Sequence, residues 1–215
     1  YTQEAFLSSG LWFSTNWDHD SLDQLFPTIR YQTTTSLIYL DAYQESIENA
    51  QNIMENNPNV TIVVRGYPTK ESTEADIVDI DLSEYVGSGQ YFIPDTFTGT
   101  LVRYTSSASL IIDAPLADAL QPGVSLINLS ISFIPNSTSS SDGQVEVSAQ
   151  GLVANSITEA TISNLTLNIG TTKGIKLTGD SSSNFGLIAG EIASTSLDGI
   201  TIHNGATYTY NVSAT

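Results

Sequence analysis

The residues of this chain that could do chemistry are mostly carboxylates, and several of them form two short clusters. The first cluster contains Asp18, Asp20 and Asp23, and the second contains Asp76, Asp79 and Asp81. The first cluster lacks the central glycine and distal glutamate of a calcium-binding loop. The second follows the polar face of a predicted strand, where acidic side chains are solvated and discourage pairing with another strand. We therefore expect acidic surfaces rather than a metal site.

Few side chains remain for other catalytic chemistry. The chain has no cysteine, so it has no thiolate nucleophile. Its two histidines, His19 and His203, are too few to make a histidine zinc site or a hydrolytic triad a good prediction. A carboxylate pair of the glycosidase type stays open, because its members need not be close in sequence. We expect a protein that is not an enzyme and holds no cofactor apart from covalent N-glycans.

Asn-X-Ser/Thr sequons are the clearest modification signals. They begin at Asn59, Asn128, Asn136, Asn164 and Asn211. Three of them fall on the polar side of segments with alternating hydropathy, and the other two stand beside turn residues. All five are expected to face solvent, as a bulky glycan requires.

The composition narrows the possible partners. The formal charge is −17, from 23 acidic and 6 basic residues, which argues against binding to nucleic acid. Only 13% of residues are charged and roughly a quarter are serine or threonine, so the surface is mainly hydroxyl, as in glycosylated extracellular proteins, acidophile surface proteins and some ordinary acidic domains. No apolar run is long enough to span a membrane. We expect a secreted, mature form whose signal peptide was removed before Tyr1.

Segments with strand periodicity dominate the chain. One amphipathic helix is predicted at residues 41–54, where apolar residues recur at helical spacing, and a helical turn is predicted at 116–120. Residues 60–64 read as a central strand, and residues 127–133 show the clearest alternation. Short strands at about 8–12-residue spacing are typical of a β-sandwich. The sequence predicts an all-β, immunoglobulin-like or pilin-like sandwich with one short helix and no repeat of fixed period.

An uncharged apolar stretch, AFLSSGLWFSTNW, occupies residues 5–17 and contains both tryptophans. Burying its large side chains would contribute a gross ~8–15 kcal/mol. The stretch is either the first strand of the protein's own sheet or a strand given to a neighbouring subunit. The residues expected to contact a receiving sheet are Phe6, Leu7, Gly10, Leu11, Trp12 and Phe13.

In this organisation the chain resembles the subunit of the archaeal thread, a glycosylated surface filament with type I pilin-like subunits. The resemblance rests on the stretch at 5–17, the cysteine-free and hydroxyl-rich β body and the five sequons, whereas the helix at 41–54 departs from a minimal pilin sandwich. It implies a head (23–215) and an N-terminal donor strand with hinge (1–22) that completes the sheet of the next subunit. It also implies an extracellular head-to-tail homopolymer that serves adhesion or biofilm formation and contacts other filaments, cells or surfaces.

Two other functions stay open. A secreted carbohydrate-binding or adhesive sandwich would use exposed aromatic side chains such as Tyr31, Tyr91 or Tyr104, although tyrosines in strands more often pack in the core. A capsid or surface-layer subunit would assemble laterally and would need no long apolar tail.

Overall fold

A computed structural model describes residues 37–103, 108–135, 144–170, 174–179 and 182–204. The chain divides into two units, 1–36 and 37–215, and all described residues belong to the second. The predicted domain boundary after residue 22 lies outside the described residues.

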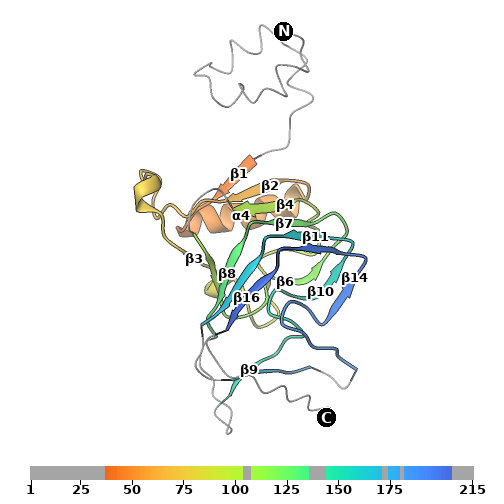
Figure 1. Cartoon of the computed structure of the whole chain (residues 1–215). Coiled ribbons are helices and arrows are strands. Elements are labelled where there is room, and N and C mark those ends of the chain that lie inside the picture. The colour runs from red at the N-terminus through yellow and green to blue at the C-terminus, as the bar shows by residue number, and fades with distance from the viewer. Residues whose placement is uncertain (1–36, 104–107, 136–143, 171–173, 180–181, 205–215) are drawn as a thin grey trace, which may run out of the picture. The chain divides into compact units, whose positions relative to one another are not determined.

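Short strands in four sheets are the main secondary structure of the described chain (Figure 1). The six-stranded sheet has the order β1 (Leu37–Leu40), β2 (Thr61–Val64), β4 (Thr100–Arg103), β7 (Ser125–Ile127), β11 (Thr161–Ser163) and β15 (Ser196–Asp198). The five-stranded sheet has the order β16 (Thr201–Asn204), β12 (Thr166–Ile169), β8 (Ser130–Phe133), β5 (Leu110–Ile112) and β3 (Ile80–Asp81). The smaller sheets are β14 (Glu191–Ala193), β10 (Ala154–Thr158) and β6 (Ala117–Leu120), and the pair β13 (Ile175–Leu177) and β9 (Val145–Val147). The helices are α4 (Gln44–Asn56) and the 3₁₀ turns η2 (Glu74–Asp76) and η3 (Ser83–Tyr85).

The chain visits the sheets in turn and so winds into stacked coils. The last three coils are β6–β7–β8, β10–β11–β12 and β14–β15–β16, and every pairing between the named strands is parallel. Thr161 pairs with Ser125, 36 residues before it, and with Ser196, 35 residues after it. A single coil cannot bury its apolar side chains alone, so neighbouring coils must stack. The described residues form a parallel β-solenoid.

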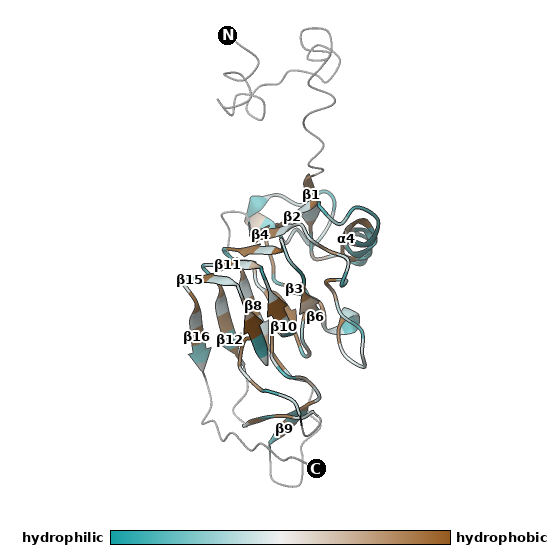
Figure 2. Ribbon diagram, turned by 90° about the vertical axis from the view of Figure 1, so that its right-hand side faces the viewer, coloured by the Kyte–Doolittle hydropathy of each residue, from teal (hydrophilic) through white to brown (hydrophobic). Residues whose placement is uncertain are grey.

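The core lies inside the coils and consists mainly of columns of aliphatic residues, together with Phe92, Phe97 and Phe133. Figure 2 shows hydrophobic segments of β8 and β10 in brown. In the middle coil Ile157, Ile162 and Leu167, one from each strand, are 0% exposed. Their neighbours in the preceding coil are Leu120, Leu126 and Ile131, which are also buried. Each fully buried side chain of this size contributes about 1.5–3 kcal/mol, so contact between coils is the main source of stability.

Two-residue corners join the strands of the middle and last coils. Glu159 and Asn164 begin the corners of the middle coil with φ angles of 48° and 52°, and Ser194 and Gly199 begin those of the last coil with 48° and 64°. This left-handed backbone conformation is uncommon outside glycine, asparagine and aspartate. The corner directs the chain into the next sheet without reversing it, which is why successive strands do not form hairpins.

Helix α4 connects the parallel neighbours β1 and β2. Parallel neighbours cannot be joined by a tight hairpin, so a crossover is required and the helix provides it. Its buried residues Ile47, Ala50 and Met54 have the predicted helical spacing and join the core. The helix prediction is confirmed, and its role is a crossover within the solenoid.

The prediction of an all-β fold is confirmed for the described residues, but the strand pairing corrects the immunoglobulin-like sandwich. A sandwich of that type is built from antiparallel sheets, whereas these strands pair in parallel between successive coils. The sequence pattern predicts the alternation of buried and exposed residues. It does not predict that each corner carries the chain into the next sheet instead of back along the same one.

Three local predictions are also wrong. Residues 116–120 contain strand β6 rather than a helical turn, because parallel pairing with β10 outweighs local helix propensity. Residues 127–133 are not one strand: the corner at Asn128, with φ of 54°, separates β7 from β8. The predicted absence of a repeat is corrected by the 35- and 36-residue register of the coils.

Candidate functional site

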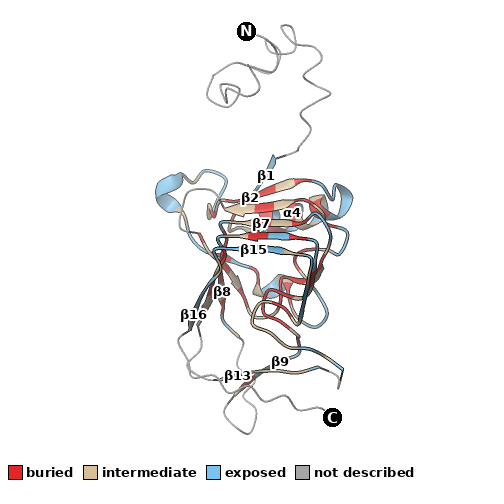
Figure 3. Cartoon of the chain, turned by 45° about the vertical axis from the view of Figure 1, so that its right-hand side comes forward, coloured by how far each residue is buried: buried red, intermediate tan, exposed pale blue. Residues whose placement is uncertain are grey.

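The last described coil exposes side chains that are buried in the equivalent positions of the coil before it. Ile192, Leu197 and Ile202 are 42%, 43% and 38% exposed, and they are in register with the middle-coil residues Ile157, Ile162 and Leu167, which are 0% exposed. Figure 3 shows β15 in pale blue, whereas every other strand of the same sheet contains at least one buried residue. We call the exposed face formed by Ile192, Leu197 and Ile202 the open end.

Unpaired backbone groups accompany this apolar face. Strand β15 is the edge of the six-stranded sheet, and β14 and β16 are edges of the two sheets beside it. An edge strand presents a row of free N–H and C=O groups that can pair with another strand. Among the described residues, the open end therefore combines an uncovered apolar face with three strands able to accept neighbours.

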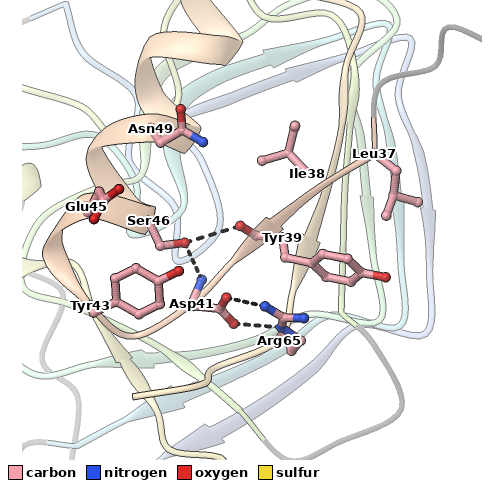
Figure 4. Close-up of a pocket in the computed structure, with 9 residues that line it drawn as sticks. All are labelled: Leu37, Ile38, Tyr39, Asp41, Tyr43, Glu45, Ser46, Asn49 and Arg65. Atoms are coloured by element: carbon pink, nitrogen blue, oxygen red, sulfur yellow. Dashed lines mark hydrogen bonds and ion pairs between the residues drawn. The ribbon is translucent and has the colours of Figure 1, made fainter. Parts of the chain in front are cut away.

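A pocket of about 430 Å³ lies at the opposite edge of the six-stranded sheet, between β1, the start of α4 and Arg65 after β2 (Figure 4). The Arg65 guanidinium lies over the rings of Tyr39 and Tyr67, 4.2 and 4.1 Å from their centroids. Such stacking holds the side chain in one orientation and adds a cation–π attraction.

The charge in this pocket is already neutralised. Arg65 donates to the Asp41 carboxylate from Nε at 2.9 Å and from Nη2 at 2.5 Å. Asp41 follows β1 as Arg65 follows β2, so the parallel register places them side by side. The hydrogen bond to Asp41 raises the pKa of Arg65, while partial burial acts against it. Because the Asp41 side chain is only 2% exposed and also accepts from the backbone of Tyr67 at 3.1 Å, the pair ties β1 to β2 rather than awaiting a ligand.

The structure brings together two sequons that are far apart in the sequence. Asn128 and Asn164 occupy equivalent corners of neighbouring coils, and Asn164 Nδ2 donates to Asn128 Oδ1 at 3.0 Å. Both side chains are exposed, as is that of Asn59 in the turn before β2. Neighbouring strands lie ~4.8 Å apart, so these two predicted glycosylation sites are close neighbours on the surface. The sequons at Asn136 and Asn211 lie outside the described residues.

The acidic cluster of Asp76, Asp79 and Asp81 does not converge on a common site. Asp76 accepts hydrogen bonds from the backbone N and the Oγ1 of Thr73 at 2.8 and 3.0 Å, which lowers the pKa of its carboxyl group. Asp79 accepts from the backbone of Ser109 at 2.7 Å, and Asp81 accepts within its own turn. In the described ranges no group of three or more His, Cys, Asp or Glu residues could hold a metal ion.

The other residues singled out from the sequence are spread apart or not described. Tyr91 is half-buried and its hydroxyl oxygen accepts from Asn155 Nδ2 at 3.1 Å, so it is part of the coil packing. His203 is exposed on β16. Residues outside the described chain are Phe6, Leu7, Gly10, Leu11, Trp12, Phe13, Asp18, His19, Asp20, Asp23, Tyr31 and Tyr104.

Sequence reasoning missed the residues of the open end. Two signals in the sequence could have identified them. The segments GLVA at 151–154 and GLIA at 186–189 begin equivalent parts of two coils, and apolar residues then recur every five positions. Comparing those two segments would have revealed the repeat and shown that the second copy has no successor among the described residues.

Within the described residues no helix is long and apolar enough to cross a membrane. Comparison of the chain with protein-family models, with curated proteins and with solved structures found no match.

Proposed function

We propose that this protein is a structural subunit of an extracellular surface filament that polymerises head to tail and serves adhesion or biofilm formation. The observation that carries the proposal is the open end, where three inward-facing aliphatic side chains and three strand edges are uncovered together. A strand edge next to apolar surface favours addition of further strands.

The placement of this face favours an open chain of subunits over a closed dimer. The open end belongs to β14, β15 and β16, whereas β1 is the far edge of the six-stranded sheet. A contact that joins one end of a subunit to a different surface of the next is heterologous and repeats without closing. The solenoid thus replaces the groove of a sandwich as the surface that accepts a neighbour.

The open end cannot hold a filament by itself. Burying the exposed parts of Ile192, Leu197 and Ile202 is worth roughly 2–4 kcal/mol in all, because each is about two-fifths exposed. Micromolar association needs about 8 kcal/mol. The partner must therefore supply large apolar side chains and backbone hydrogen bonds of its own, which the stretch at 5–17 offers.

The composition of the surface supports the proposed extracellular location. The sequons at Asn59, Asn128 and Asn164 are exposed, and serine and threonine rather than charge make up much of the polar surface. Covalent glycans on such a surface would keep the sides of the filament soluble while its ends associate.

The test compares two aspartate substitutions at apolar residues of equal exposure. Leu197→Asp puts a charge at the centre of the open end, while Val78→Asp adds the same charge at a residue that is also 43% exposed but lies outside the open end. Electron microscopy and sedimentation should show filaments for the native protein and for Val78→Asp, and dispersed subunits for Leu197→Asp. A native protein that stays monomeric at every concentration would refute the proposal.

A further inference from the structure

We propose that residues Phe6–His19 of a second copy form a further coil on the open end, with Leu7, Trp12 and Trp17 covering Ile192, Leu197 and Ile202. This inference rests on the proposed function and specifies its contact. The added segment would supply three short strands, one for each uncovered edge, instead of one long strand in a groove.

The spacing of apolar residues carries the assignment. Inward-facing residues recur every five positions in the middle coil, at 157, 162 and 167, and again in the last coil, at 192, 197 and 202. In the N-terminal stretch, Leu7, Trp12 and Trp17 have the same spacing of five. The strands β14 to β16 span Glu191–Asn204, and the register that aligns Leu7 with Ile192 maps this span onto Phe6–His19.

Alternative registers place unsuitable residues inside. Moving the alignment by one position puts Asn16 in the core, and moving it the other way puts Ser8 and Asp18 there. A buried charge or an unpaired amide costs several kcal/mol. Among the registers of residues 5–19, only the one with Leu7 buries three large apolar side chains.

The corners also agree with this register. It places Gly10 above Thr195, in the same column as the buried Ala160. A glycine is therefore small enough for this column. The same register places Ser9 above Ser194, which adopts φ of 48° in the last coil. A serine is therefore already accommodated at that type of corner in this fold.

The proposed filament makes a second copy the occupant of the open end. The described chain begins at Leu37 in β1, at the edge of the six-stranded sheet opposite β15, roughly 24 Å away at ~4.8 Å between neighbouring strands. A contact between opposite edges of two copies repeats head to tail without closing, as the filament requires. Residues 20–36 could extend to ~56 Å, so both occupants are within reach, and the double variant below distinguishes them.

The absence of cysteine allows a direct test by disulfide trapping. Four single variants are prepared: Leu11→Cys, Phe13→Cys, Ser196→Cys and Asp198→Cys. The register makes residue 11 the neighbour of 196 and residue 13 the neighbour of 198, at Cα distances of ~4.8 Å. The crossed pairs 11–198 and 13–196 are about 8 Å apart, beyond the ~7 Å that a disulfide can bridge. The crossed pairs contain the same four cysteines and serve as matched controls.

Each tail variant is mixed with each open-end variant under oxidising conditions, and linked dimers are counted on a non-reducing gel. We expect the 11–196 and 13–198 pairs to give at least tenfold more linked dimer than the crossed pairs. Equal yields from all four pairs would overturn the register. A double variant Leu11→Cys/Ser196→Cys that links within one chain at high dilution would overturn the second copy as the occupant.

Failure of this inference can be told apart from failure of the proposed function. Normal filaments in electron microscopy without any in-register link would overturn the added coil and leave the filament proposal intact. If the native, cysteine-free protein forms no filaments, both are overturned.

Discussion

The middle coil, β10–β11–β12, and the last described coil, β14–β15–β16, are two copies of one pattern in different surroundings. Both place aliphatic residues at intervals of five and turn at left-handed corners. In the middle coil these residues are 0% exposed, and in the last coil they are 38–43% exposed. The sequence pattern decides which way a side chain points, and the neighbouring coil decides whether it is buried.

This difference in burial also distinguishes residues that stabilise the folded subunit from residues that are available for association between subunits. Side chains between two coils hold the subunit together, because removing one leaves a cavity. The same side chains at the open end are covered on one side only, so part of their contribution belongs to the subunit and the rest to binding. Substitutions at equivalent positions should therefore affect different measurements.

The largest expected contrast is between Ile162→Ala and Leu197→Ala. Ile162 is fully buried, so truncation should lower the free energy of unfolding by about 2–5 kcal/mol. Leu197→Ala should cost less, about 0.5–2 kcal/mol in the dilute subunit, because its side chain is 43% exposed. Urea unfolding at concentrations that keep the protein monomeric measures both. Equal losses would mean that the open end is already covered.

The next contrast breaks the contact between the two coils. A Cβ at Gly151 would lie 2.4 Å from Ala189 Cα and 2.6 Å from the Ile188 carbonyl oxygen, both backbone atoms before the last coil. Gly151→Ala should cost about 1–3 kcal/mol through overpacking. Gly174→Ala is the control, because its Cβ would contact only the side chain of Gln144 at 3.3 Å or more. If both variants unfold at the same urea concentration, the close approach at Gly151 is not limiting.

A smaller effect is expected at Asn164, the corner residue of the middle coil that is hydrogen-bonded to Asn128 in the preceding coil, β6–β7–β8. Asn164→Ala removes the hydrogen bond to Asn128, worth about 0.5–1.5 kcal/mol, and leaves alanine in a left-handed conformation that costs about 1–2 kcal/mol more. Asn164→Gly loses the hydrogen bond but tolerates the conformation. Thermal unfolding should rank the native protein first, then glycine, then alanine. An alanine variant as stable as the glycine variant would argue against the corner geometry.

The smallest effect concerns pH and a turn outside both coils. Hydrogen bonds from Thr73 lower the pKa of Asp76 in the folded state from its ordinary value of 3.8. Its contribution is therefore present above about pH 4 and is lost as the pH falls through the folded pKa. Asp76→Asn should remove this part of the pH dependence without changing the difference between Ile162→Ala and Leu197→Ala. Unfolding curves at pH 7 and pH 3 test this, and an unchanged pH dependence in Asp76→Asn would contradict it.

Local pattern was sufficient for some elements and not for others. The spacing of Ile47, Ala50 and Met54 predicted α4, and the β-branched run at 60–64 predicted β2. Both signals depend only on neighbours in the sequence. The corner at Asn128 was read as the middle of one strand, because alternation continues across it in the sequence while the backbone turns.

The coil repeat was hidden by the connections between coils. Residues 134–153 and 170–190 separate successive coils, and each contains an additional strand, β9 or β13. Apart from GLVA and GLIA near their ends, these segments share little sequence, so most of the periodicity is confined to the strands themselves. The open end could not be predicted from its own residues, since Ile192, Leu197 and Ile202 are of the same residue types as the buried side chains and differ from them only in lacking a further coil stacked on them among the described residues.

The central claim is that the open end is uncovered in the single subunit and covered in the filament. Amide hydrogen exchange of the peptide containing residues 191–204 tests it most directly, with residues 154–169 of the middle coil as the internal reference. We expect the 191–204 amides to exchange rapidly in the dilute monomer and at least tenfold more slowly in the assembled material, while the reference changes little. Amides of 191–204 that are already protected at high dilution, or that stay unprotected in assembled filaments, would contradict the account.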